Sequence, residues 1–217
     1  MTDVSVISRG PTTVPHTERQ WVRRGELLEA ARVVFEMQGY HAATVSAIVQ
    51  RAGLSQGAFY LYFSDKKAVF AALQEEMATL LRRRIYWATR EEADPERRLE
   101  AGLRAYFEYV EEYRAWNHRL MIEGLGIDAS FEARQIALYE TLAAAFRPTL
   151  LQLGATDPEL AAAALTGLAQ QVAYSQHFQR EWQPAKPAGD LARECARLFL
   201  RGAASDSNQR AQGGTNA

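Results

Sequence analysis

A short stretch of hydrogen-bonding and aromatic residues, Ser55–Tyr62, is where residue types and spacing first indicate a chemistry. In a helix its side chains divide between two faces. Ala58, Phe59 and Tyr62 would face inward, and Gln56, Gly57, Tyr60 and Leu61 outward. A short helix that buries one face and presents amide, hydroxyl and aromatic groups on the other suits the major groove of DNA, which admits one α-helix. The stretch therefore predicts hydrogen bonding to base edges.

A second short helix must hold this one in place. Thr44 is a good N-cap residue, Gly53 occupies the position of a left-handed C-cap, and Ser55 can cap the following helix. Between them an apolar face recurs at helical spacing through Val45, Ile48, Val49 and Ala52. Helices this short are unstable alone, so tertiary packing must hold them. The pattern predicts a helix-turn-helix braced by Ile48, Phe59 and Phe63.

The segment Leu27–Leu73, LLEAARVVFEMQGYHAATVSAIVQRAGLSQGAFYLYFSDKKAVFAAL, resembles the N-terminal domain of the TetR family of bacterial transcriptional regulators. The resemblance covers about fifty residues without a gap. It includes a Gly-Tyr pair after the first helix, the AGLSQGAFYLYF block and the Asp-Lys-Lys that follows. One departure is Gln56, where the family often has a basic residue. Base reading here must therefore rest on amide, hydroxyl and aromatic groups.

The resemblance implies which residues meet DNA. The matching positions are Thr44, Ser46, Ser55, Gln56, Gly57, Ala58, Tyr60, Tyr62 and Lys66. Of these, Thr44, Tyr60 and Lys66 would mainly hold phosphates. The residues nearer base edges would be Gln56, Gly57, Ala58 and Tyr62.

The charge distribution supports DNA contact at one end of the chain. The net charge of −1 conceals 12 Lys and Arg against 8 Asp and Glu in residues 1–90, and 13 against 18 in residues 91–217. A basic N-terminal part beside an acidic remainder fits DNA binding confined to the N-terminal part. The overall composition, 47% hydrophobic and 24% charged, is typical of a folded globular protein.

Several classes of site and location are not expected. The single Cys195 excludes an intrachain disulfide and a CxxC metal site, and the four histidines are too scattered to specify a metal site. We find no HExxH, glycine-rich phosphate loop or nucleophile motif, so we expect no catalytic residues and no cofactor. No apolar run approaches the ~18 residues of a membrane span, and the N-terminus lacks the pattern of a signal peptide. We therefore expect a cytoplasmic protein.

Start and stop signals predict an all-α fold of about nine helices. The first helix should end at Gly39, Ser64 should cap the fourth, and Asp-Pro pairs at 94–95 and 157–158 should start two more. The eighth helix should run to about Trp182 and the ninth from about Asp190 to Arg201. The predicted organisation is a disordered arm (1–16), a three-helix helix-turn-helix domain (17–65), a helical effector-binding and dimerisation domain (66–203) and a disordered tail (204–217).

The second half is rich in aromatic side chains that could line a pocket or simply fill a helical core. Rings bury much apolar area, while phenol and imidazole groups can fix one polar end of a ligand. This composition favours a small, mostly apolar effector, aromatic or acyl. The expected effector-binding residues are Trp87, Tyr106, Tyr109, Tyr113, Trp116, Phe146, Tyr174 and His177.

The last two helices carry small and apolar stripes that permit close approach of another helix. In the family the corresponding pair forms the dimer interface, and the resemblance implies the same arrangement here. One short reading helix makes too few contacts for specific affinity, which also favours a two-fold dimer. The expected interface residues are Ala161, Ala164, Leu165, Leu168, Val172, Leu191, Cys195 and Leu198.

Taken with the resemblance, the sequence indicates a dimeric, ligand-responsive transcriptional regulator. We expect a repressor that binds a palindromic operator in double-stranded DNA and leaves it when a small molecule binds. The alternatives are a helical protein-binding adaptor, which failure to bind any DNA would favour, and an enzyme, which turnover of a bound ligand would favour. Neither alternative explains the segment Gly53–Lys67.

Overall fold

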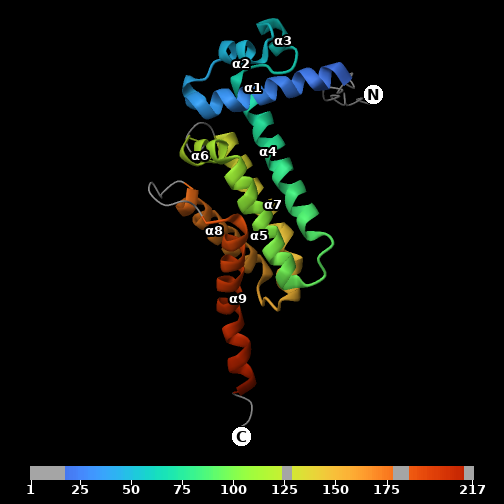
Figure 1. The fold of residues 1–217 in the computed structure, drawn as a ribbon, viewed down its shortest axis with the longest axis vertical. Coiled ribbons are helices and arrows are strands. Elements are labelled where there is room, and N and C mark those ends of the chain that lie inside the picture. The colour runs from blue at the N-terminus through green and yellow to red at the C-terminus, as the bar shows by residue number, and fades with distance from the viewer. Residues whose placement is uncertain (1–17, 124–128, 178–185, 213–217) are drawn as a thin grey trace, which may run out of the picture.

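The computed structural model describes residues 18–123, 129–177 and 186–212, and within these ranges the chain forms helices and turns but no strand (Figure 1). The prediction of an all-α fold is therefore confirmed. The described helices are α1 (Glu18–Ala42), α2 (Val45–Ala52), α3 (Gln56–Tyr60), α4 (Lys66–Thr89), α5 (Pro95–Glu112), α6 (Arg114–Glu123), α7 (Ala129–Gln152), α8 (Pro158–His177) and α9 (Ala188–Gln212).

The first three helices form a small group at one end of the molecule, with α9 at the other end (Figure 1). Their common core contains Leu27 and Phe35 from α1, Ile48 from α2 and Phe59 from α3, each at most 1% exposed. The regular helical backbone of α1 breaks at Gly39, whose φ of 77° lies in the left-handed region that glycine adopts without strain. The chain can therefore turn there from α1 towards α2.

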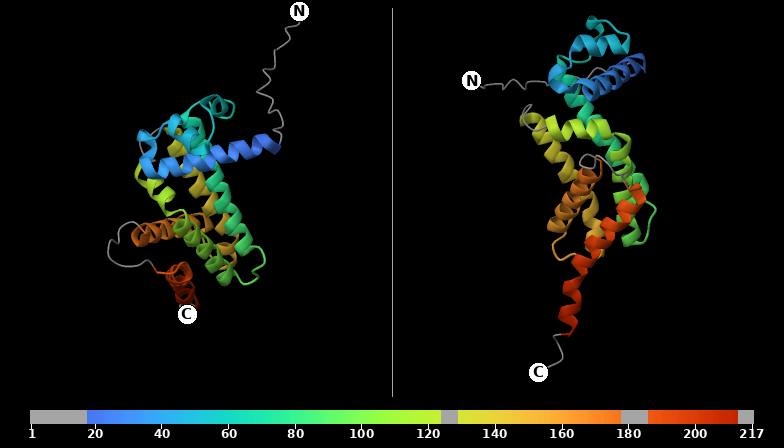
Figure 2. Two further views of the ribbon diagram at one scale, coloured as in Figure 1. Left: turned by 45° about the horizontal axis from the view of Figure 1, so that its top comes forward. Right: turned by 60° about the vertical axis from the view of Figure 1, so that its left-hand side comes forward.

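Helix α4 connects this group to the rest of the molecule. It leaves the helix-turn-helix and runs along the remaining helices in both views of Figure 2. Its buried side, which includes Phe70, Leu73, Met77 and Leu81, packs against α1, α5 and α7. One helix thus contacts both the helix-turn-helix group and the helical body.

Helix α5 is at the centre of the helical body. It packs against α4, α6, α7, α8 and α9. Leu99, Leu103, Phe107 and Val110 are all at most 2% exposed. Because both sides of α5 are covered, the helices of the second half share one core.

Most predicted helix starts agree with the structure. The side chain of Asp94 accepts a hydrogen bond from the Glu96 amide, and that of Asp157 accepts one from the Leu160 amide. The N-cap of α4 is Asp65 rather than Ser64, because it is the Asp65 carboxylate that accepts from the Ala68 amide at 2.7 Å. The one-residue shift leaves the path of α4 unchanged.

The ends of the chain differ more from expectation. Helix α9 continues to Gln212, well past Arg201, so most of the segment expected to be a disordered tail (204–217) is helical. The expected arm (1–16) and the expected end of α8 near Trp182 lie outside the described residues. The continuation of α9 was missed because its last residues are polar and lack an apolar stripe.

Gly102 on α5 allows a close approach of α7, and an alanine there should destabilise the fold. A Cβ at this position would lie 2.7 Å from Phe146 Cε1 and 3.3 Å from Thr89 Cγ2. Since Phe146 is buried, we expect Gly102→Ala to lower the free energy of unfolding by about 1–3 kcal/mol in urea denaturation.

Gly25→Ala on α1 is the matched control. An added methyl group there meets nothing within 4 Å, so the better helix propensity of alanine should raise the free energy of unfolding by up to about 1 kcal/mol. If both variants had the same stability change, close packing of α5 on α7 at Gly102 would be contradicted.

Candidate functional site

The helix-turn-helix is built as the sequence predicts. Thr44 Oγ1 accepts from the Ala47 amide at 3.1 Å and caps α2, and Ser55 Oγ accepts from the Ala58 amide at 3.2 Å and caps α3. Between the two helices Gly53 has φ 66° and ψ 30°, the left-handed conformation of a C-cap. The caps, the turn and the buried Phe59 fix the position of a helix only five residues long.

The outer face of α3 is polar and aromatic. Gln56 and Gly57 are exposed, Tyr60 is 57% exposed, and Ala58 and Tyr62 are half-buried. Leu61 is 78% exposed on the same face, although it was not among the predicted site residues. Its helical spacing from Gln56 and Gly57 was the signal that places it there, and an exposed leucine can contact a thymine methyl group.

The predicted hydroxyl contributors lie at the starts of the two helices. Thr44, Ser46 and Ser55 are all exposed. Because Thr44 and Ser55 already accept backbone N–H groups as caps, each retains its O–H as a donor. Both hydroxyls are therefore held at fixed positions, that of Thr44 at the start of α2 and that of Ser55 at the start of α3.

Lys66 does not present its ammonium group to the surroundings. Its Nζ donates to the carbonyl oxygens of Tyr40 at 2.6 Å, His41 at 3.1 Å and Ala43 at 2.9 Å, and lies 4.5 Å from the centroid of the Tyr40 ring. An ammonium has three N–H donors, and all three are used here. In this structure Lys66 thus has a structural role, which the sequence did not indicate because the acceptors are 23–26 residues away, and its phosphate contact stays a prediction.

The location of Lys66 suits a cation. The carbonyls of Tyr40 and His41 lie at the end of α1, where unpaired carbonyl groups leave partial negative charge. Partial burial lowers the pKa of Lys66, because removal from water disfavours the charged form. The adjacent Lys67 is exposed and is the better placed cation at the start of α4.

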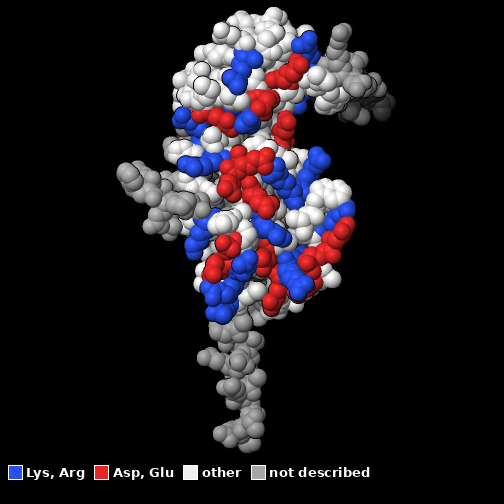
Figure 3. Space-filling view, in the orientation of Figure 1, with Lys and Arg blue, Asp and Glu red and all other residues white. Residues whose placement is uncertain are grey.

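Few charged side chains appear on the face of α2 and α3 seen in Figure 3. The only Lys or Arg within these two helices is Arg51 at the end of α2. Any base recognition by α3 must use neutral groups, in agreement with the sequence interpretation.

A cavity of about 250 Å³ lies in the helical body, between α4, α5, α6 and α7. Of the eight predicted effector-binding residues, Tyr109 and Trp116 line it. Burial raises the pKa of Tyr109, so its phenol stays protonated and available as a donor. The apolar part of the lining includes Met77, Ala78 and Leu138.

The other predicted effector residues are distributed elsewhere. Tyr174 lines a larger and more open cleft of about 550 Å³ between α7 and α8. Tyr106, Phe146 and His177 are buried, and none of them lines the cavity or the cleft. Burial lowers the pKa of His177. Their aromatic and imidazole groups therefore belong to the packed core, which residue type alone did not reveal.

Trp87 lines neither the 250 Å³ cavity nor the 550 Å³ cleft. It is 55% exposed, and the guanidinium of Arg90 lies 3.7 Å from the centroid of its ring. Residue type alone suggested a buried ring, whereas the path of α4 turns position 87 outward. The prediction that Trp87 binds the effector conflicts with this exposure.

The cavity is joined to the helix-turn-helix by aromatic contacts. The ring of Trp116, which lines the cavity, lies 5.4 Å from that of Phe70 on α4. Phe70 in turn lies 4.9 Å from Phe35 and 5.0 Å from Tyr40, both on α1. Tyr40 supplies a carbonyl to Lys66. Packed rings thus connect the ligand-sized space to the turn before α2.

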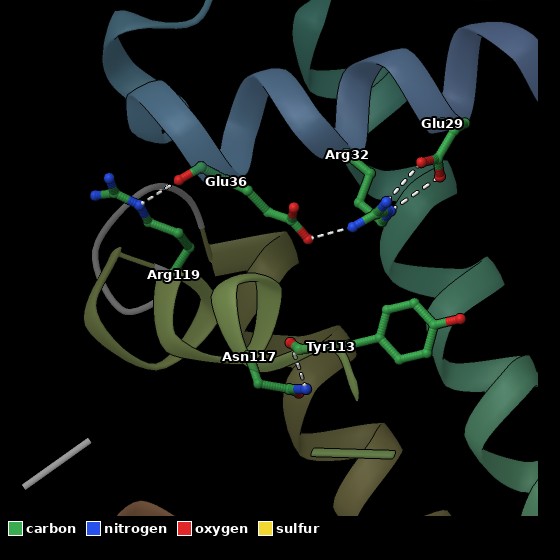
Figure 4. Close-up of polar contacts among 6 residues, drawn as sticks. All are labelled: Glu29, Arg32, Glu36, Tyr113, Asn117 and Arg119. Carbon is green, nitrogen blue, oxygen red and sulfur yellow. Dashed lines mark hydrogen bonds and ion pairs between the residues drawn. The ribbon is translucent and has the colours of Figure 1, made fainter. Parts of the chain in front are cut away.

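A polar junction between α1 and α6 provides a second connection (Figure 4). Arg119 Nε donates to the carbonyl of Glu36 at 3.2 Å. Arg32 binds the carboxylates of Glu29 and Glu36, and its guanidinium lies 5.9 Å from the ring centroid of Tyr113. The predicted effector residue Tyr113 therefore lies at this junction rather than in the 250 Å³ cavity.

The predicted dimer-interface residues fall into two groups. Leu165, Leu191 and Cys195 are at most 3% exposed within the single chain, and burial raises the pKa of Cys195 to about 11. They pack into the core of the single chain, which leaves almost none of their surface for a partner, and their place in an interface stays a prediction. The remaining residues have exposed surface: Ala161, Ala164, Leu168, Val172 and Leu198.

The described part of the chain shows neither a cluster of metal ligands nor a membrane-spanning helix. No group of three or more metal-ligating side chains occurs there. None of the described helices is long and apolar enough to cross a bilayer.

Comparison with known proteins gives one family. The model described as "Bacterial regulatory proteins, tetR family" matches residues 27–73. The transcriptional activator FasR of Mycolicibacterium smegmatis is 37% identical over 101 residues, covering 46% of this chain and 46% of that protein. The transcriptional repressor AcnR of Corynebacterium glutamicum is 34% identical over 128 residues, covering 58% of this chain and 63% of that protein.

A solved structure extends the likeness to the whole fold. The transcriptional regulator FadR from Bacillus subtilis, solved in complex with stearoyl-CoA, superposes with a TM-score of 0.68 over 82% of this chain and 98% of that one. At 20% sequence identity this likeness concerns the fold alone.

Lys66→Met should separate a structural role from DNA contact. The substitution keeps the aliphatic stem but leaves three carbonyls without their donor, so we expect the free energy of unfolding to fall by about 2 kcal/mol or more in urea. The salt dependence of DNA binding by the folded variant should not change.

Lys67→Met is the matched control at the exposed neighbour. It should leave stability nearly unchanged and, if Lys67 meets a phosphate, reduce the slope of log affinity against log salt by about one. A Lys66→Met protein of normal stability with a reduced salt slope would show that the ammonium contacts the DNA backbone after all.

Proposed function

We propose that this chain, which belongs to the TetR family of bacterial transcriptional regulators, is a dimeric repressor that a small, mostly apolar effector releases from a palindromic operator. The chain is a transcriptional regulator rather than an enzyme. The observation that carries the proposal is the outer face of α3, polar and exposed, on a helix that capping and buried rings hold rigidly. Relatives include both an activator and a repressor, and repression is our choice because the AcnR alignment covers more of this chain.

Base reading would be done by neutral groups of α3. Gln56 is exposed at the first position of the helix, where its amide could pair bidentately with adenine. Gly57 and Ala58 would permit close approach of the backbone, and Tyr62 and Leu61 would add aromatic and apolar contacts. This division assigns sequence preference to α3 alone.

Backbone contacts would come from the hydroxyls around α3 and from Lys67. Thr44, Ser46 and Ser55 are exposed at the starts of α2 and α3, and the Tyr60 ring is more than half exposed. Such contacts position the reading helix without specifying sequence. One half-site offers few charge contacts, so specific affinity requires a second copy bound to the other half-site.

Gln56→Ala should relax base preference. We expect a loss of roughly 1–3 kcal/mol of discrimination at one or two positions of each half-site, since the variant lacks the amide that pairs with adenine. The measurement is selection of bound sequences from random DNA, with Gln50→Ala on the exposed face of α2 as the matched control. An unchanged preference in Gln56→Ala would exclude Gln56 as a reader.

The dimer would form through the outer sides of α8 and α9. In the single chain Leu160 is 67% exposed and Leu198 is 59% exposed, and Ala164 between them in sequence is also exposed. Small and apolar side chains on adjacent helices allow close packing with the same pair from a second copy. This redefined set replaces the inward-facing leucines as the interface.

Leu198→Glu should break the dimer without disturbing the core of either copy. A carboxylate forced into an apolar interface costs several kcal/mol, and dissociation exposes it to water. We expect sedimentation to show a monomer at micromolar concentration that no longer binds the operator. Met37→Glu, at a 70% exposed position on α1, should sediment as the dimer; an intact Leu198→Glu dimer would place the interface elsewhere.

The effector would bind in the 250 Å³ cavity between α4 and α7. Helix α4 extends from Lys66 beside α1 to the cavity-lining Ala78 and Arg82, so a small shift at the cavity moves the reading end. To release DNA, the effector must bind the DNA-incompetent arrangement more tightly, and a hundredfold preference, about 2.7 kcal/mol, is sufficient. The stearoyl-CoA bound to the Bacillus subtilis FadR makes acyl-CoA one effector class to test.

A further inference from the structure

Three buried polar atoms in the residues that line the 250 Å³ cavity lack a hydrogen-bond partner among the described residues. They are Gln74 Oε1, Trp116 Nε1 and Gln135 Oε1. Gln74 is 8% exposed and Trp116 is fully buried. Leaving such groups unpaired destabilises a fold, so their presence in the lining of one cavity, on α4, α6 and α7, favours a ligand that supplies the missing hydrogen bonds.

The chemistry of these atoms limits the ligand group that meets them. The indole N–H of Trp116 only donates, so it requires an acceptor. Gln135 uses its amide nitrogen to donate to Tyr139 Oη at 3.3 Å, which leaves Oε1 as an acceptor that requires a donor. The Gln74 amide can accept a hydrogen bond through its oxygen or donate one through its nitrogen. One group that both donates and accepts hydrogen bonds would satisfy the set.

The charges around the cavity favour an uncharged ligand group. The charged residues in its lining are Glu75, Arg82 and Arg134. Arg82 is bound to the Glu75 carboxylate at 2.8 Å, and Arg134 is exposed and donates to the Ser130 carbonyl. The unpaired buried atoms are all neutral, so an anion placed among them would lose its hydration, and the only lining cation outside the Arg82–Glu75 ion pair is the exposed Arg134, whose attraction water screens.

The cavity volume limits the size of the ligand. About 250 Å³ is slightly below the range of roughly 300–1,000 Å³ that is typical of sites for drug-sized ligands. A molecule of the size of stearoyl-CoA far exceeds this space. The cavity therefore suits a single ring or a short chain.

We infer that the effector is a small, uncharged, mostly apolar molecule whose single polar group is a primary amide or a hydroxyl bound by Gln74, Trp116 and Gln135. This inference rests on the proposed function, since it names the ligand class of the same site. It separates this chain from the acyl-CoA chemistry that its structural likeness suggests.

Calorimetry on the full chain with two isosteric probes tests the inference. The neutral 3-phenylpropanamide should bind at least about tenfold more tightly than the anionic 3-phenylpropanoate, because only the carboxylate must lose the hydration of a charge. Tighter binding of the carboxylate or of stearoyl-CoA would overturn the inference. Failure of both the amide and the hydroxyl probe 4-propylphenol to bind at millimolar concentration would also overturn it.

Gln74→Leu tests the position of the polar group. Affinity for 3-phenylpropanamide should fall about tenfold, whereas the thermal midpoint of the ligand-free protein should not fall, because an unpaired buried amide is removed. Trp116→Phe, which keeps a ring but removes the N–H donor, should weaken binding similarly. Gln170→Leu makes the same side-chain change in the cleft between α7 and α8 and should have no effect. Weakening in Gln170→Leu with normal binding in Gln74→Leu would place the ligand in that cleft and refute the assignment.

DNA binding measured in parallel separates this inference from the proposed function. A chain that binds the amide in the Gln74-dependent manner but binds no DNA would support the cavity assignment and contradict the regulator. A chain that binds its operator and is released only by an acyl-CoA would contradict the cavity assignment but support the proposed function as a regulator.

Discussion

The ammonium group of Lys66 is the interaction on which the arrangement of the two halves depends. It ties the first residue of α4 to the carbonyls of Tyr40 and His41 at the end of α1 and of Ala43 before α2. Three chain segments therefore meet at one cation. Because the carbonyls would otherwise be unpaired at a helix terminus, the same contact satisfies the end of α1 and fixes the angle at which α4 leaves the helix-turn-helix.

That junction lies at the end of a packed route from the cavity. Trp116 lines the cavity and contacts Phe70, which contacts Phe35 and Tyr40 on α1. Close-packed rings transmit displacement because no free volume lies between them to absorb it. The polar junction of Arg32, Glu36 and Arg119 also joins α6 to α1. A ligand that repositions α6 would thus act on α1 through both apolar and polar contacts.

The outer face of α3 carries no charged side chain, and this limits the affinity of one copy for DNA. With Lys66 used internally and no Lys or Arg in α3, a single copy can neutralise few phosphates. In the proposed dimer, sequence preference and affinity would then come from amide, hydroxyl and apolar contacts made by each of the two copies. The exposed apolar side chains on α8 and α9, far from α3 in Figure 1, offer a surface through which a second copy can bind without obstructing the DNA.

The sequence by itself determined the features whose causes are local. The caps Thr44, Ser55 and Asp94 and the left-handed Gly53 could be predicted because each depends on atoms within four residues in the chain. Tertiary structure decided what long-range packing controls. An apolar stripe can face its own core or a partner, and a ring can fill a core or line a cavity, with no change in residue type. Only the positions of distant helices directed Lys66 to α1, turned Leu165 inward and Leu198 outward, and brought Gln74 to the same cavity as Trp116.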